Sequence, residues 1–201
     1  HKEGIAGGTF VGSSLGGYFA QYMASRHPEV VERAVFGNTF PPNDILAAEY
    51  GSLAGKLPWM PEWLVMEQLK KNTAQNLYPA SGNSELVAAY LDEQAHGRMS
   101  KNQFGARVRC VLDAFAVNRE AVARIPKLII EADNDPLISP ELREKLKQTY
   151  PDARVATMSG VGHFPYLNAD DEYIDILQDF FAANPVGEHR PASQPAGRSK
   201  T

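Results

Sequence analysis

The chain has 201 residues, of which 43% are hydrophobic and 22% charged, so it can bury a core and is not a disordered protein. Its net charge is −4, which excludes the basic surface typical of nucleic-acid binding. No apolar run approaches the ~18 residues that a membrane span needs. The single cysteine, Cys110, excludes an internal disulfide, so we expect a cytoplasmic protein in which Cys110 is a small buried side chain.

The N-terminal part predicts two short strands with a helix between them. Residues 8–13 read as a buried strand, and a helical pattern follows at once and ends before Pro28, which cannot continue a helix. Residues 33–38 form a second short apolar run. From Pro41 to about Phe115 there are helical patterns, such as 86–95, but no convincing strand. This segment is predicted to be an inserted helical lid.

The C-terminal part returns to alternating strands and helices. Strands are expected at 127–132 and, with a weaker pattern, at 153–158. Ser139 begins one helix, with Leu142, Leu146 and Tyr150 on its apolar face. Asn168 could cap a last helix, whose expected apolar residues are Ile174, Leu177, Phe180 and Phe181. Strands alternating with amphipathic helices indicate an α/β fold with a parallel sheet covered on both faces.

These patterns divide the chain into a core, an insertion and a tail. Residues 1–40 and 116–183 are predicted to form the α/β core, 41–115 the lid, and 184–201 a disordered tail. Five apolar side chains of the lid could line a substrate pocket, although packing of the helices onto the sheet is the favoured explanation for most of them: Trp59, Met60, Trp63, Met66 and Phe104.

The segment Gly12-Ser13-Ser14-Leu15-Gly16 matches G-x-S-x-G between a predicted strand and a predicted helix. This is the setting of a nucleophile elbow, a strained turn whose flanking positions must lack side chains. Only Ser14 has glycine at both −2 and +2, so Ser14 is the candidate nucleophile. The backbone N–H of Leu15 would then help to bind an oxyanion. The alternative is a Gly/Ser turn that only begins a helix.

A serine hydroxyl needs a base to take its proton, and the chain has five histidines: His1, His27, His96, His163 and His189. Only His163 lies in a glycine-containing loop directly after a predicted core strand. His163 is therefore the candidate base, and its alternative role is to satisfy loop hydrogen bonds.

The histidine needs an acid that orients it, and the strand at 127–132 runs into Asp133-Asn134-Asp135-Pro136. Asp135 is the preferred acid because Asp-Pro makes a turn at the carboxyl end of the strand, where ligands bind in open parallel sheets. Asp133 is the rival, and turn formation or helix capping is the alternative for both. The chain order Ser14, Asp135, His163 is that of α/β-hydrolases.

These motifs resemble the α/β-hydrolase superfamily over essentially the whole chain to residue 183. The combination of Gly37–Phe40, Leu69–Asn72, Tyr150–Ala153 and Phe164–Leu167 resembles its maspardin-like branch. The resemblance implies that strands and a second oxyanion donor precede the elbow. The chain is therefore expected to be N-terminally truncated, inactive on its own and prone to aggregation.

The function expected from these residues is hydrolysis of a carboxylic ester or similar acyl substrate by a serine triad, without a metal or an organic cofactor. Cleavage of an activated carbon–carbon bond could use the same triad. The maspardin resemblance also implies a non-catalytic scaffold that binds a protein partner. Eukaryotic maspardins lack the catalytic histidine, so His163 favours catalysis here.

Overall fold

The computed structural model describes residues 7–94 and 99–186. The predicted tail beyond residue 186, and His1, His96 and His189, lie outside the described residues. In chain order the elements are β1 (Gly8–Ser13), α1 (Leu15–Arg26), η1 (Pro28–Val30), β2 (Val31–Gly37), α2 (Ile45–Lys56), η2 (Leu57–Trp59), α3 (Glu62–Asn72), η3 (Thr73–Leu77), α4 (Tyr78–Ala80), α5 (Glu85–Glu93), α6 (Lys101–Leu112), α7 (Arg119–Ala123), β3 (Lys127–Ala132), α8 (Pro140–Thr149), β4 (Arg154–Met158), α9 (Pro165–Asn168) and α10 (Asp170–Ala183).

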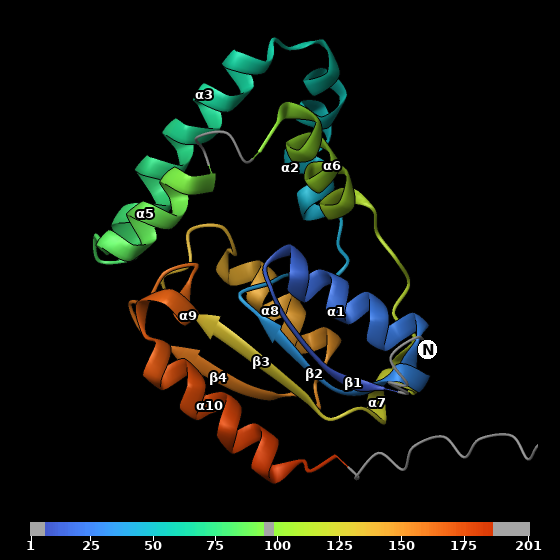
Figure 1. The fold of residues 1–201 in the computed structure, drawn as a ribbon. Coiled ribbons are helices and arrows are strands. Elements are labelled where there is room, and N and C mark those ends of the chain that lie inside the picture. Colours follow the sequence, from blue (N-terminus) through green and yellow to red (C-terminus); the bar gives the residue numbers. More distant parts are fainter. Residues whose placement is uncertain (1–6, 95–98, 187–201) are drawn as a thin grey trace, which may run out of the picture.

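The four strands form one parallel sheet in the order β1-β2-β3-β4 (Figure 1). All four predicted strands are present, with bounds that differ by at most two residues from those expected. Helices α1, α7 and α8 cover one face, and α10 covers the other (Figure 1). The predicted α/β fold with a parallel sheet covered on both faces is confirmed.

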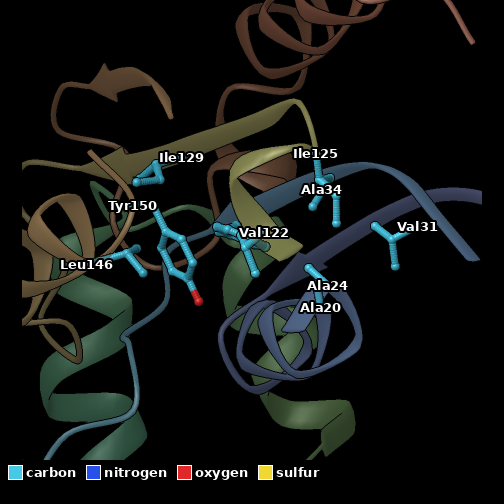
Figure 2. Close-up of a cluster of buried hydrophobic side chains, with 10 residues drawn as sticks. Ala20, Ala24, Val31, Ala34, Val122, Ile125, Ile129, Leu146 and Tyr150 are labelled. Atoms are coloured by element: carbon cyan, nitrogen blue, oxygen red, sulfur yellow. The ribbon is translucent and has the colours of Figure 1, made fainter. Parts of the chain in front are cut away.

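The core follows the two-residue period of the strands. Ile129 of β3 lies in one buried cluster with Ala20 and Ala24 of α1 and Leu146 and Tyr150 at α8 (Figure 2). Its neighbours Leu128 and Ile130 point to the other face, toward Tyr173 and Phe180 of α10. Successive strand residues point to opposite faces, so the near-continuous apolar run of β3 is what a doubly covered strand requires.

The segment between β2 and β3 is helical, as expected, and α2, α3, α5 and α6 extend beyond the carboxyl ends of the strands (Figure 1). The favoured packing of this segment onto the sheet is wrong for its tryptophans: Trp59 is 88% exposed and Trp63 68% exposed. Cys110 is also exposed on α6, not buried. A sequence pattern gives the period of a helix, but which neighbour covers it depends on distant contacts.

The last helices differ in detail from the prediction. Ser139 caps α8 by accepting a hydrogen bond from the Leu142 N–H, as expected. Asn168 does not cap α10; its side-chain amide donates to the carbonyl of Ser81 at 2.9 Å instead. Ile174 is exposed, and Tyr173 takes the buried position on α10. Within the described part of the chain, no helix is both long and apolar enough to cross a membrane.

Candidate active site

Polar residues follow all four strands at the carboxyl edge of the sheet. Ser14 follows β1, Asn38 follows β2, Asp135 lies three residues after β3, and His163 lies in the loop after β4. Parallel strands end at the same edge, and this is where open α/β sheets bind ligands. The fold thereby brings the three sequence-predicted residues to one edge, together with an asparagine that the sequence analysis did not select.

Ser14 occupies a strained turn between β1 and α1. Its backbone has φ 55° and ψ −123°, a conformation that a residue other than glycine rarely adopts. The Ser14 N–H donates to the carbonyl of Gly37 at 2.9 Å, and the Thr39 hydroxyl donates to the Ser14 carbonyl at 2.7 Å. Leu15 is the first residue of α1, so its N–H has no intrahelical acceptor and is available to a bound group.

The glycines around Ser14 differ in what they allow. A Cβ on Gly12 would lie 2.1 Å from the carbonyl oxygen of Gly16, and one on Gly17 would lie 2.8 Å from the Cβ of Thr39. Both positions therefore need glycine. Gly16 was also expected to need the absence of a side chain. That expectation is wrong, because a Cβ on Gly16 would have no neighbour within 4 Å among the described residues.

Asp135 and His163 form a buried pair. The His163 Nδ1 lies 2.8 Å from Oδ2 and 3.0 Å from Oδ1 of Asp135, and both side chains are buried. Gly162, with φ 69°, lets the loop pass close to the carbonyl of Ala80, only 2.9 Å from where a Cβ would lie. Because the carboxylate accepts, Nδ1 carries the proton of neutral His163 and Nε2 is its basic nitrogen.

The carboxylate of Asp135 stays ionised despite its burial. Burial alone would raise the pKa of Asp135, but His163, the amide of Asn38 and the N–H of Leu137 together outweigh it and hold the pKa below the ordinary value. Besides the His163 Nδ1, the nearest donors to this carboxylate are the Asn38 Nδ2 and the Leu137 N–H, each at 2.8 Å. An ionised acid beside Nδ1 suits a histidine that must accept and return a proton.

The rival acid, Asp133, has a different set of partners. Its carboxylate accepts from the Ser159 hydroxyl at 2.7 Å and from the Gly160 N–H at 2.8 Å, and it is exposed. These hydrogen bonds lower the pKa of Asp133. Asp133 thus fixes the start of the loop that carries His163, whereas Asp135 contacts the imidazole itself.

The Ser14 hydroxyl and the His163 imidazole form no hydrogen bond in this structure. Among the hydrogen bonds of the described residues, none connects the Ser14 hydroxyl with His163. Such contacts are often long without substrate and shorten in the reacting complex. His27, the remaining described histidine, pairs with Glu29 at 3.5 Å near the start of η1 and lies apart from this group.

Asn38 is the site residue that the sequence analysis missed. It is 2% exposed, and its Nδ2 donates to Asp135 Oδ2 and to the Gly162 carbonyl at 3.2 Å. The sequence did contain a signal for this residue, because Asn38 directly follows a strand, as Ser14 does. The sequence reading counted it as the last residue of the strand itself.

The described residues include no group of three or more His, Cys, Asp or Glu side chains placed to hold a metal ion. The carboxyl edge of the sheet holds a histidine–carboxylate pair and, after β1, a strained serine. Such a set can transfer protons and attack a carbonyl group with its own side chains.

Comparison with known proteins gives the family. A model of the alpha/beta hydrolase fold matches residues 4–170. An sn-1-specific diacylglycerol lipase of Mus musculus is 23% identical over 193 residues, covering 89% of this chain and 60% of the lipase. A pimeloyl-[acyl-carrier protein] methyl ester esterase of Nitrosospira multiformis is 25% identical over 188 residues, covering 84% of this chain and 66% of the esterase. The chain thus spans about two thirds or less of the length of these relatives.

A solved structure agrees with this assignment at the level of the fold. A hydrolase from Pseudomonas aeruginosa superposes with a TM-score of 0.73 at 19% identity, covering 90% of this chain and 66% of that one. The family match covers most of the chain, and the parallel sheet with its helices agrees with it. The chain belongs to the alpha/beta hydrolase fold family.

Proposed function

We propose that the protein is a serine hydrolase that cleaves a carboxylic ester or similar acyl substrate, with Ser14, His163 and Asp135 as its triad. The observation that carries the proposal is the buried contact of 2.8 Å between His163 Nδ1 and Asp135, at the sheet edge where Ser14 occupies a strained turn. The names of the two relatives, a diacylglycerol lipase and a methyl ester esterase, favour the same substrate class.

In the proposed reaction, the Ser14 Oγ attacks the substrate carbonyl carbon while His163 Nε2 takes its proton. The Leu15 N–H donates to the oxyanion that forms. His163 then gives the proton to the leaving alcohol, and an acyl–Ser14 ester remains. Water, deprotonated by His163, hydrolyses this ester and restores the hydroxyl. Asp135 stays ionised throughout and holds the imidazole in the required tautomer. No metal or organic cofactor takes part.

The helical segment 41–115 is proposed to act as the lid of this site. Two of its residues accept hydrogen bonds from the acid loop and from the helix that follows the histidine loop. The Asn134 Nδ2 donates to the Ala80 carbonyl at 2.7 Å, and the Asn168 side chain, at the end of α9, donates to the Ser81 carbonyl at 2.9 Å. Segments fixed beside a catalytic centre shape the space that the substrate occupies. We also propose that the protein is cytoplasmic, as its single cysteine led us to expect.

Two other functions use the same scaffold. Hydrolysis of an activated carbon–carbon bond would need the same triad. A maspardin-like scaffold that binds a protein would need none of it, so the buried His163–Asp135 pair favours an enzyme. The distinction rests on whether Ser14 is activated.

Fluorophosphonate labelling followed by peptide mass spectrometry tests the proposal. The full natural polypeptide should carry the adduct on the Ser14 peptide, because such probes need a serine activated by a base. Ser14→Ala and His163→Ala should each lower ester turnover by about 10⁴-fold or more. Ser52→Ala, at an exposed position of α2, serves as the control and should label normally. Folded protein that gains no adduct would refute the enzyme and favour the binding scaffold.

A further inference from the structure

The residue after β2 has an unusual backbone and a fixed side chain. Asn38 has φ 38°, in the left-handed region, and its N–H donates to the carbonyl of Ile130 at 2.7 Å. Asparagine tolerates this region better than most residues other than glycine. The backbone geometry aims the buried side chain at the acid and histidine loops.

The orientation of the Asn38 amide follows from its neighbours. Its Nδ2 faces two acceptors, Oδ2 of Asp135 and the carbonyl of Gly162, at 2.8 and 3.2 Å. Rotating the amide by 180° would place its oxygen against a carboxylate and a carbonyl. The Asn38 Oδ1 is buried and has no hydrogen-bond partner among the described residues. A buried amide oxygen without a partner is unfavourable, so we attribute the presence of an asparagine here to the two hydrogen bonds that its Nδ2 donates.

The same turn also holds the nucleophile. Gly37 accepts the Ser14 N–H, and Thr39 donates its hydroxyl to the Ser14 carbonyl. Residues 37–39, which we name the β2 turn, therefore contact Ser14, Asp135 and the loop of His163. Among the described residues, no other segment forms hydrogen bonds with all three.

We propose that Asn38 is a positioning residue of the triad: its amide orients the Asp135 carboxylate toward His163 and ties both loops to the turn that holds Ser14. The inference rests on the proposed function and adds a fourth residue to its site. Asn38 does not touch the reacting atoms and acts through Asp135.

Asn38 can control the orientation of Asp135 because few donors bind each carboxylate oxygen. Asp135 Oδ1 accepts from the N–H groups of Leu137 and Ile138, and Oδ2 accepts from Asn38, while His163 Nδ1 lies within 3.0 Å of both oxygens. Without the amide, Oδ2 loses the one donor besides the imidazole that the described residues supply, and the carboxylate can rotate. A carboxylate with one donor fewer also attracts a protonated imidazole more strongly.

Substitution of Asn38 leaves the other charged residues near the pair unaltered in the sequence. Glu131 of β3 and Arg143 of α8 line, together with Asp135, the small space that Asn38 also lines. Lys147 pairs with Glu131 at 3.3 Å, and Asp133 binds the start of the histidine loop. A shift in pH dependence on changing residue 38 would therefore report on the Asn38–Asp135 contact.

Three variants of the full natural polypeptide, assayed with a short-chain p-nitrophenyl ester, separate the amide from the backbone. Asn38→Asp keeps the shape but removes the donor, Asn38→Ala removes the amide, and Asn38→Gly removes it without left-handed strain. Each should lower kcat/KM by about 10- to 100-fold, the worth of one hydrogen bond to a charged group. The acid limb of the kcat/KM profile should move to higher pH, furthest in Asn38→Asp.

Asn83→Ala is the matched control. Asn83 also has a left-handed backbone, with φ 60°, but it is exposed in the turn before α5. It should retain the kcat/KM and the pH profile of the unsubstituted enzyme. Near-ultraviolet circular dichroism shows which variants remain folded, and Asn38→Gly or Asn38→Asp decides the matter if Asn38→Ala does not fold.

The outcomes separate this inference from the proposed function. If the unsubstituted protein neither turns over ester nor labels at Ser14, the proposed function fails and the role of Asn38 fails with it. If that protein is active and the folded variants keep kcat/KM within about twofold with the same acid limb, only the role of Asn38 is refuted. If Asn38→Gly or Asn38→Asp alone is fully active, backbone strain or shape is the cause, and the positioning role is again refuted.

Discussion

The central residue of the site is an acid that is buried and yet ionised. Asp135 can remain a carboxylate only because donors occupy both of its oxygens. Those donors come from three places: the turn of Asp135 itself, the β2 turn, and the imidazole of His163 in the loop after β4. The same contacts that orient His163 therefore stabilise the folded state. Function and stability depend here on one set of hydrogen bonds.

The lowered pKa of Asp135 predicts a pH dependence of stability. Its folded pKa lies below the ordinary 3.8, so its stabilising contribution is complete above that pH and is lost as the pH falls through the folded value. Below pH 3.8 the free energy of unfolding should fall less steeply in Asp135→Asn than in the unsubstituted protein. Urea unfolding between pH 5 and pH 3 measures this. Asp175→Asn, at an exposed position of α10, controls for the loss of one carboxylate, and equal slopes for Asp135→Asn and the unsubstituted protein would contradict the prediction.

At the scale of elements, the sequence predicted what depends on local chemistry. The strands at 8–13 and 127–132 are apolar runs bounded by turn residues, and α1 ends where Pro28 requires it. Ser14 could be recognised because its glycines mark the turn. In contrast, Tyr173 replaces Ile174 on the buried side of α10, and Asn168 binds Ser81 instead of capping, because both outcomes depend on contacts with distant segments. Asn38 was missed for the same reason.

Replacement of glycine by alanine should have opposite effects in the tight turn around Ser14 and in the open middle of α2. Gly12→Ala would place a Cβ 2.1 Å from a backbone oxygen, which cannot move without displacing α1. We expect a loss of about 1–3 kcal/mol or more in stability, together with loss of Ser14 labelling. Gly51→Ala, where a Cβ has no neighbour within 4 Å inside α2, should gain about 0.5–1 kcal/mol. Urea unfolding compares the two, and a tolerated Gly12→Ala with normal labelling would show that the elbow is not as tight as described.

At the scale of the whole molecule, one edge of the sheet is less covered than its centre. Val11 of β1 pairs in register with Val35 of β2, and Val35 is fully buried under α10 while Val11 is 49% exposed. Helix α10 thus covers this face from β2 onward but not β1. Strands of a parallel sheet are normally buried on both faces, and an exposed apolar edge strand promotes pairing between molecules.

We therefore predict that residues 1–201, prepared alone, self-associate through β1 and hydrolyse ester poorly. Light scattering after size-exclusion chromatography should show oligomers that grow with concentration. Val11→Lys should reduce them, because a charge on an edge strand opposes strand addition. Val155→Lys, at an exposed position of the opposite edge strand β4, is the matched control and should have less effect, since β4 is packed against α10 on its inner side. A monomeric, cooperatively unfolding and esterase-active chain would show that the sheet is complete without further strands beside β1.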